Sequence, residues 1–124
     1  IENVGASSIV ADSAAGNFDA MRYTYYAAFQ DPVSFLKLLE TGSNINFSRY
    51  SNPAFDKLLD EADKTLDAQK RIQLLREAET LAMADHPVIP VFFYYRYYLV
   101  SQKIAGWTDN LRGEHLARYL SMKN

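Results

Sequence analysis

The residues best suited to bind a ligand lie in one aromatic segment, residues 18–26, which carries a single cation, Arg22. The planar guanidinium of arginine binds a carboxylate through two parallel hydrogen bonds, and tyrosines combine an apolar ring with a hydroxyl group. The segment therefore fits the wall of a ligand cleft in which Arg22 meets a ligand carboxylate. Composition alone favours the other interpretation, a buried strand in which Arg22 pairs with a carboxylate of the protein itself.

A second tyrosine cluster lies nearer the C-terminus, at Tyr94, Tyr95, Tyr97 and Tyr98. These rings fit either a second binding surface or packing in a core or between domains. Because large aromatic side chains stabilise interiors through the area that they bury, we interpret this cluster as packing.

No residue pattern indicates catalysis or a metal centre. Acyl transfer needs a nucleophile, a base and an oxyanion donor, and the only natural bases are His86 and His115. His86 stands directly before a proline, where we interpret it as the end of a helix. The chain has no cysteine and no HExxH motif, so it offers no recognisable zinc-ligand spacing. We therefore expect no enzyme activity, no metal and no cofactor.

The composition is that of one globular domain that binds no nucleic acid. The 124 residues are 48% hydrophobic, and the formal net charge of -2 leaves no broad basic surface to neutralise a row of phosphates. No apolar run approaches the roughly 20 residues that a membrane span requires. The first residues carry neither an initiating Met nor an export signal. We expect the chain to be a segment of a longer protein.

Helices are predicted on both sides of the aromatic segment. The Ala- and Ser-rich N-terminal residues predict a helix that ends at Gly16, which tolerates a left-handed conformation. Asp31 and Pro32 are a cap and a first helical residue, so a short helix is predicted from there to Gly42. The polar residues 41–52 predict a loop.

The aromatic segment itself, residues 18–29, predicts a strand with two occupied faces. Its alternation places Arg22, Thr24 and Tyr26 on one face and Met21, Tyr23 and Tyr25 on the other.

Residues 53–85 predict a helical hairpin. Asn52-Pro53 repeats the cap-and-proline start, a brief break follows at 65–67, and His86-Pro87 ends the second helix. On the first helix the apolar stripe is Phe55, Leu58, Leu59 and Ala62. On the second we expect Ile72, Leu75, Ala78 and Leu81 or Ala82 on the buried face, and Lys70, Arg71, Arg76 and Glu77 on the wet face.

The C-terminal part predicts two further strands. Residues 88–100 are rich in β-branched and aromatic side chains, and residues 116–122 fit a shorter strand after turn-forming residues. The order of elements predicts a mixed α/β (α+β) fold whose sheet is incomplete, so we expect partner strands from outside this chain.

Four motifs in register resemble the C-terminal third of the oligopeptide-binding proteins, the extracellular solute-binding proteins of family 5 that serve ABC importers. The motifs are Phe18-Asp19 followed by Arg22, DPxSFL at 31–36, YSNPAFD at 50–56, and VIPV at 88–91 with its aromatic tail. The most specific piece is the aromatic residue followed by Asn-Pro-Ala-Phe-Asp, a helical hairpin and an apolar strand with Ile-Pro-Val. Relatives of this kind are several times longer than 124 residues.

The resemblance implies a type II periplasmic-binding fold, in which two α/β lobes close over an extended peptide. It places residues 1–91 in the C-terminal part of the second ligand-binding lobe, and residues 92–124 in the crossover and return segment to the first lobe. The chain would then carry one wall of the site.

The resemblance also implies the site residues. The strand from Arg22 to Ala28 would run beside the ligand and bond to its main chain, as an added β-strand does. Arg22 matches an arginine that pairs with a ligand carboxylate. Further matched positions that line the ligand are Tyr23, Thr24, Tyr25 and Tyr26.

Position 28 departs from the family pattern. Ala28 stands where peptide binders usually place an aspartate for the α-amino group of the ligand. A free amine could be recognised by Asp31, if the chain is locally shifted relative to the family, or by the rest of the polypeptide. Otherwise the protein would not recognise a free amine.

The function expected from the resemblance is capture of a peptide or peptide-like solute for an ABC importer, in the periplasm or another extracytoplasmic compartment. The partners would be the ligand, the importer permease and the remainder of the same polypeptide, with no nucleic acid. One alternative is an autonomous interaction domain whose hairpin, 53–85, packs a partner helix. An esterase-like enzyme is a third possibility, with no residue pattern in its favour.

Overall fold

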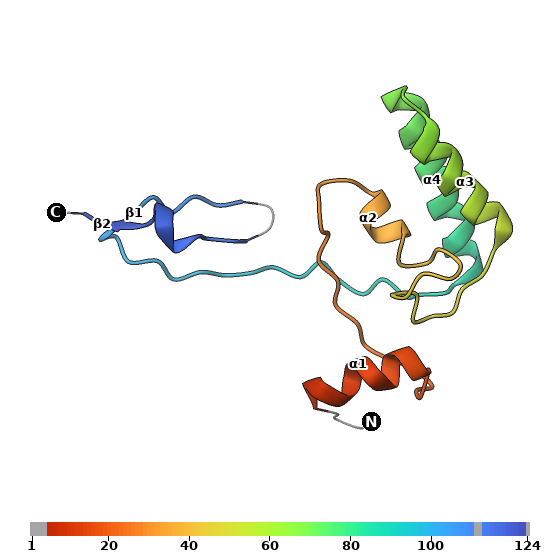
Figure 1. Cartoon of the computed structure of the whole chain (residues 1–124), viewed down its shortest axis with the longest axis horizontal. Helices are drawn as coiled ribbons and strands as arrows, with labels where there is room; N and C mark the ends of the chain where they lie inside the picture. The colour runs from red at the N-terminus through yellow and green to blue at the C-terminus, as the bar shows by residue number, and fades with distance from the viewer. Residues whose placement is uncertain (1–4, 111–112, 124) are drawn as a thin grey trace.

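The computed structural model describes residues 5–110 and 113–123. The chain is extended, with a helical unit at one end and a small antiparallel ribbon at the other (Figure 1). Residues 86–101 join the two as a long segment without helix or strand. No helix in the described part of the chain is long and apolar enough to cross a membrane.

The first helix, α1, spans Ala6–Ala15 and ends as predicted. Gly16 has φ of 75°, so the left-handed conformation that glycine allows terminates the helix. Arg49 donates a hydrogen bond from its guanidinium to the carbonyl of Ala15. This bond ties the C-terminus of α1 to the loop at 41–52.

The second helix, α2, spans Val33–Leu36 and is shorter than predicted. The Asp31 carboxylate accepts a hydrogen bond from the Val33 amide at 2.9 Å, so the predicted cap is confirmed. Beyond Leu36, the amides of Leu38 and Leu39 donate hydrogen bonds to the carbonyls three residues earlier in the chain. The chain therefore continues in tight 3₁₀-type turns.

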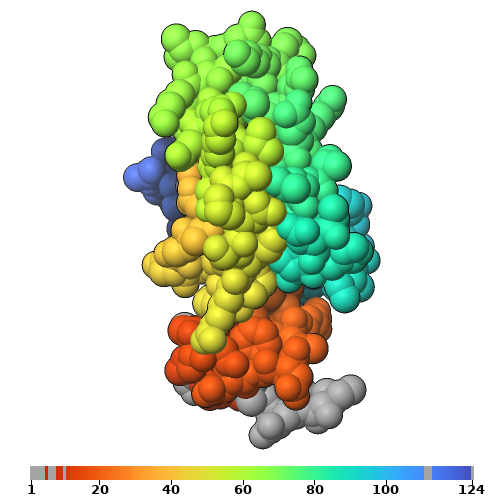
Figure 2. Space-filling model, turned by 90° about the vertical axis from the view of Figure 1, so that its right-hand side faces the viewer, coloured from red at the N-terminus to blue at the C-terminus, as the bar shows by residue number. Residues whose placement is uncertain are grey.

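The predicted helical hairpin is confirmed as α3, Pro53–Lys64, and α4, Ala68–Asp85. The Asn52 side chain accepts hydrogen bonds from the Ala54 and Phe55 amides, and the Asp67 side chain accepts one from Lys70. His86 follows α4 with φ of 55°, which ends it before the proline. The two helices lie side by side on the face shown in Figure 2, with α1 below them.

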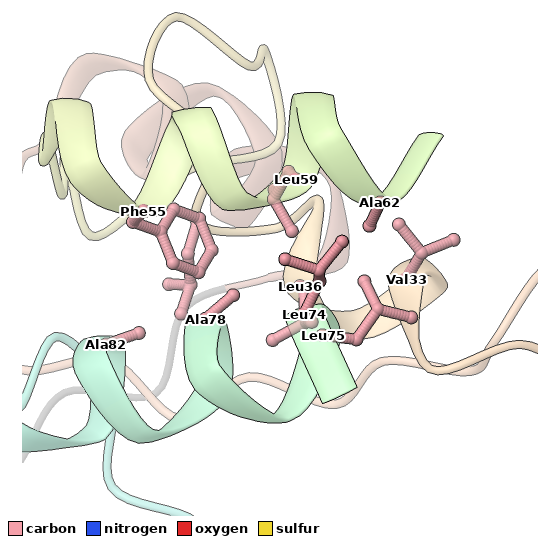
Figure 3. Packing of buried hydrophobic residues seen from close by; sticks show 10 residues of the cluster. Val33, Leu36, Phe55, Leu59, Ala62, Leu74, Leu75, Ala78 and Ala82 are labelled. Carbon is pink, nitrogen blue, oxygen red and sulfur yellow. The ribbon is translucent and has the colours of Figure 1, made fainter. Parts of the chain in front are cut away.

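The core lies between α2, α3 and α4 (Figure 3). Phe55 and Leu59 of α3 are its largest fully buried side chains. Its buried apolar members are Val33, Leu36, Leu39, Phe55, Leu59, Ala62, Leu74, Leu75, Ala78 and Ala82.

Three of the residues predicted to be buried on α4, namely Leu75, Ala78 and Ala82, are confirmed. Ile72 is 40% exposed, so its assignment to the core was wrong, and Leu74 is buried instead. The reason is that α2 also packs against α4. The face of α4 that it covers carries Leu74, which belongs to the same core as Leu36 of α2, whereas Ile72 lies outside that core. Arg71, predicted to face water, is only a quarter exposed because it pairs with Asp31.

The predicted strands at 18–29 and 88–100 were wrong as hydrogen-bonded strands, since neither segment contains a strand residue. A strand requires a neighbour for its backbone groups, and the described residues supply none to either segment.

The ribbon near the C-terminus pairs β1, Ile104–Ala105, antiparallel with β2, Ser121–Met122. The predicted strand at 116–122 therefore shrinks to two residues, because a 3₁₀ turn at Ala117–Tyr119 precedes them. Gly106 has φ of 82°, and a β-carbon there would lie 1.9 Å from the Tyr119 carbonyl oxygen. Only glycine fits this close approach.

Candidate functional site

The predicted ligand-binding positions 22–28 form one exposed segment, which we call the candidate ligand wall. Arg22, Tyr23, Thr24, Tyr26 and Ala28 are exposed, and Tyr25 is half-buried. The segment runs from α1 toward α2 and is crossed by the segment 88–100 (Figure 1).

One face of the candidate ligand wall packs on the helical unit. The Tyr23 ring meets Phe47 edge-on at 5.3 Å between centroids, and the Tyr25 ring meets Phe35 at 5.8 Å. Tyr23 and Tyr25 also stack on each other at 6.5 Å. These contacts anchor the alternate residues of the wall to α2 and to the loop at 41–52.

That loop is itself held by Asn46, whose side-chain amide donates to the carbonyls of Glu40 at 3.1 Å and Tyr50 at 2.8 Å. The Tyr50 amide donates back to the Asn46 side-chain oxygen at 3.2 Å. Phe47, next in the chain, is thereby held where it meets Tyr23.

The other face of the wall meets the segment 88–100. The Arg22 guanidinium carbon lies 6.0 Å from the centroid of the Phe92 ring. The Tyr26 ring meets Tyr94 edge-on at 6.0 Å, and the Arg96 guanidinium carbon lies 4.2 Å above it. The alternation predicted from the sequence is therefore present in these contacts, although the wall has no strand neighbour.

Arg22 has no carboxylate within ion-pair distance among the described residues. The interpretation of Arg22 as half of a structural ion pair thus has no support within residues 5–110 and 113–123. Among the described residues, the Arg22 guanidinium has a contact with the Phe92 ring but no hydrogen-bond acceptor, so its donors could serve a ligand.

The two positions considered for amine recognition are both engaged. The Ala28 amide donates to the hydroxyl of buried Ser34 at 3.0 Å. Both oxygens of Asp31 accept hydrogen bonds from Arg71, at 2.7 and 3.0 Å. Arg71 lowers the pKa of Asp31 below its usual value, chiefly through these hydrogen bonds and against the effect of burial. Asp31 is therefore a structural ion-pair partner in this structure.

Two groups of contacting residues were missed by the sequence reasoning. Phe35 and Phe47 support the wall from elements distant in sequence, and no pattern in a single sequence indicates such contacts. The contact of Arg96 with the Tyr26 ring was not predicted either. The period-two spacing of Arg96 with Phe92 and Tyr94 was the available signal, because alternate residues share a face.

The segment 88–100 leaves one face bare. Its odd-numbered side chains are 71–106% exposed, namely Ile89, Val91, Phe93, Tyr95, Tyr97 and Leu99. The even-numbered Phe92, Tyr94 and Tyr98 are 43–65% exposed, since they contact the wall or the C-terminal ribbon. Exposed apolar side chains gathered on one face of a segment are typical of a surface that contacts another part of a protein.

The side chains of the candidate ligand wall suit binding. Within the described ranges, no group of three or more His, Cys, Asp or Glu side chains could hold a metal ion. The arrangement can instead offer tyrosine rings, hydroxyl groups and one guanidinium to a ligand, which is binding chemistry.

Comparison with known proteins gives relatives much longer than this chain. The chain is 28% identical over 106 residues to the dipeptide-binding protein DppE of Bacillus subtilis, covering 86% of this chain and 20% of that protein. It is 34% identical over 93 residues to the periplasmic oligopeptide-binding protein OppA of Salmonella typhimurium, covering 75% and 17%. The solved structure of OppA from Burkholderia pseudomallei matches with a TM-score of 0.88 and 30% identity, covering 99% and 24%. No family model matches the chain. The chain spans about a fifth of the length of these relatives.

Proposed function

From its homology to part of the oligopeptide-binding family of solute-binding proteins, we propose that this chain supplies one wall of a binding site for a peptide or peptide-like solute. The relatives named above are described as binding dipeptides or oligopeptides. The whole protein would deliver the solute to the permease of an ABC importer from the periplasm or an equivalent extracytoplasmic space. It would bind and release the solute without chemistry.

The observation that carries this proposal is the exposure of the candidate ligand wall. Among the described residues, Arg22 contacts the Phe92 ring and no carboxylate, so its hydrogen-bond donors are available to a ligand. Tyr23 and Tyr25 alternate along the same segment. An extended segment without strand neighbours offers its main-chain groups to an extended ligand. Backbone hydrogen bonds do not depend on ligand side chains, so such a wall suits many peptide sequences. Arg22 would add a bidentate contact to a ligand carboxylate.

The bare face of the segment 88–100 supports a division of this chain between two lobes. We infer that residues 1–91 belong to the C-terminal part of the second lobe and residues 92–124 to the crossover and return segment to the first. The remainder of the polypeptide would then cover Phe93, Tyr97 and the other exposed apolar side chains. The relatives are about five times longer, which leaves enough chain to do so.

The alternative of an autonomous interaction domain is weaker. The buried apolar residues of α3 and α4 already pack against each other and against α2, so most of the apolar surface of the hairpin is not available to a partner helix. An open hollow on α4 is lined by four polar side chains and two apolar ones, namely Gln73, Arg76, Glu77, Thr80, Leu81 and Ala84.

Calorimetric titration of the complete protein with the tripeptide trialanine tests the proposed function. We expect saturable binding at one site, and no turnover of ester substrates. Absence of binding to trialanine and to a mixture of random tripeptides and pentapeptides would reject a peptide ligand. If the protein hydrolyses esters, and substitution of one of its serines abolishes that activity, the proposal that it only binds its solute would be rejected.

A further inference from the structure

Tyr26 is held on two sides by residues of one other segment. The Arg96 guanidinium carbon lies 4.2 Å above the Tyr26 ring, and the Tyr94 ring meets its edge at 6.0 Å with an interplanar angle of 87°. A guanidinium over the face of an aromatic ring is attracted by the negative charge density of that face. The orientation of an otherwise half-exposed tyrosine is therefore defined by Arg96 and Tyr94.

Arg96 is in turn held through Tyr98, which contacts residues between β1 and β2. Hydrogen bonds with the hydroxyls of Tyr98 and Tyr26 raise the pKa of Arg96. The Tyr98 hydroxyl also donates to the Gly113 carbonyl at 3.0 Å, and its ring meets Trp107 and His115 at 5.2 and 5.0 Å.

Gly113 makes this anchor possible. A β-carbon at position 113 would lie 2.6 Å from the Tyr98 hydroxyl and 3.0 Å from a guanidinium nitrogen of Arg96. The φ of 62° at this glycine further disfavours any other residue. A continuous set of contacts thus runs from the ribbon through Tyr98 and Arg96 to Tyr26.

We propose that Arg96 is a positioning residue for the candidate ligand wall, fixing the Tyr26 ring in the orientation that the ligand meets. This inference rests on the proposed function only in assuming that the wall meets a ligand. It differs from the proposed function because Arg96 acts through Tyr26 and need not touch the ligand itself.

The first arm of the test needs no ligand. The complete protein, labelled with 3-fluorotyrosine, is studied by ¹⁹F NMR, and the Tyr26 resonance is identified by its loss in Tyr26→Phe. In Arg96→Met we expect this resonance to move toward its position in the unfolded protein, whereas Arg96→Lys should retain part of the original shift. The matched control is Arg118→Met, since the Arg118 guanidinium lies over Tyr119 at 4.8 Å, away from the wall. An unmoved Tyr26 resonance in Arg96→Met would overturn the proposal.

The second arm measures affinity for trialanine. Contacting residues couple strongly, so Arg96→Met should weaken binding by about fivefold or more, and should add little in a Tyr26→Ala background. An equal loss in both backgrounds, or no loss, would overturn the positioning role. If the unsubstituted protein binds neither trialanine nor the peptide mixture, that result contradicts the proposed function, and the ¹⁹F spectra still decide whether Arg96 orients Tyr26.

Discussion

We propose that recognition of a ligand carboxylate depends on Arg22. In the complete protein, Arg22→Ala should weaken trialanine binding by roughly 2–5 kcal/mol, because a buried carboxylate would lose its charged partner. The melting temperature should not change, since Arg22 makes no ion pair within the described residues. Calorimetry measures both quantities.

The control for Arg22 is trialanine amide, which lacks the carboxylate and should bind Arg22→Ala as well as it binds the unsubstituted protein. Unchanged affinity together with a large loss of thermal stability would show that Arg22 is a structural residue.

Ala28 leads to a prediction about the other end of the ligand. No free carboxylate stands at this position, and Asp31 is already bound by Arg71. Blocking the amine of trialanine by acetylation should therefore change its affinity by less than about tenfold, or roughly 1.4 kcal/mol. Ala28→Asp should create a preference for the free amine if the longer side chain fits. A greater loss on acetylation in the natural protein would place an amine anchor elsewhere.

The Asp31–Arg71 pair predicts a pH dependence of stability. The pKa of Asp31 is lowered from 3.8, so the folded state holds the proton less tightly than the unfolded chain. The contribution of the pair is therefore complete above pH 3.8 and is lost as the pH falls through the lower, folded pKa. At neutral pH, Asp31→Asn should reduce the free energy of unfolding by about 0.5–1 kcal/mol, because the pair is partly exposed.

Under strongly acidic conditions Asp31→Asn and the unsubstituted protein should be equally stable. The asparagine can still accept the Val33 amide, so the comparison isolates the ion pair from the helix cap. Equal destabilisation at both pH values, measured by denaturant titration, would assign the effect to the cap.

The helices were predictable from the sequence because their signals are local. Asn52 and Asp67 cap α3 and α4, and apolar residues recur at helical spacing within each. The extended segments were harder, since an alternating pattern defines two faces and does not supply the neighbour that makes a strand. The contact of Arg71 with Asp31, 40 residues away, has no local signal at all.

The packing of α3 against α4 leads to a prediction about the stability of the hairpin. Leu59 is fully buried between α3 and α4, so Leu59→Ala should lower the free energy of unfolding by about 2–5 kcal/mol. The matched control is Leu66→Ala in the loop between the same helices, where the side chain is fully exposed. Denaturant titration of both variants checks this. Equal effects would mean that the core is not between these helices.

At the scale of the whole molecule, this chain is a mixed α/β part of a type II periplasmic-binding fold, as the sequence predicted. The motifs at 18–22, 31–36, 50–56 and 88–91 together predict the family, because their order and spacing are specific. The composition of the second aromatic cluster indicated that it packs, but not what it packs against. On the exposed face of the segment 88–100, Phe93 and Tyr97 are not covered by any of the described residues.

We propose that the complete protein holds a peptide-like solute against the candidate ligand wall. Native mass spectrometry of the complete protein, purified without added ligand, measures this most directly, because ligand mass and stoichiometry are read before and after denaturation. We expect one peptide-like molecule per protein, which is released on denaturation, and a lower bound fraction in Arg22→Ala. A protein that carries no ligand, and gains none when a peptide mixture is added, would contradict it.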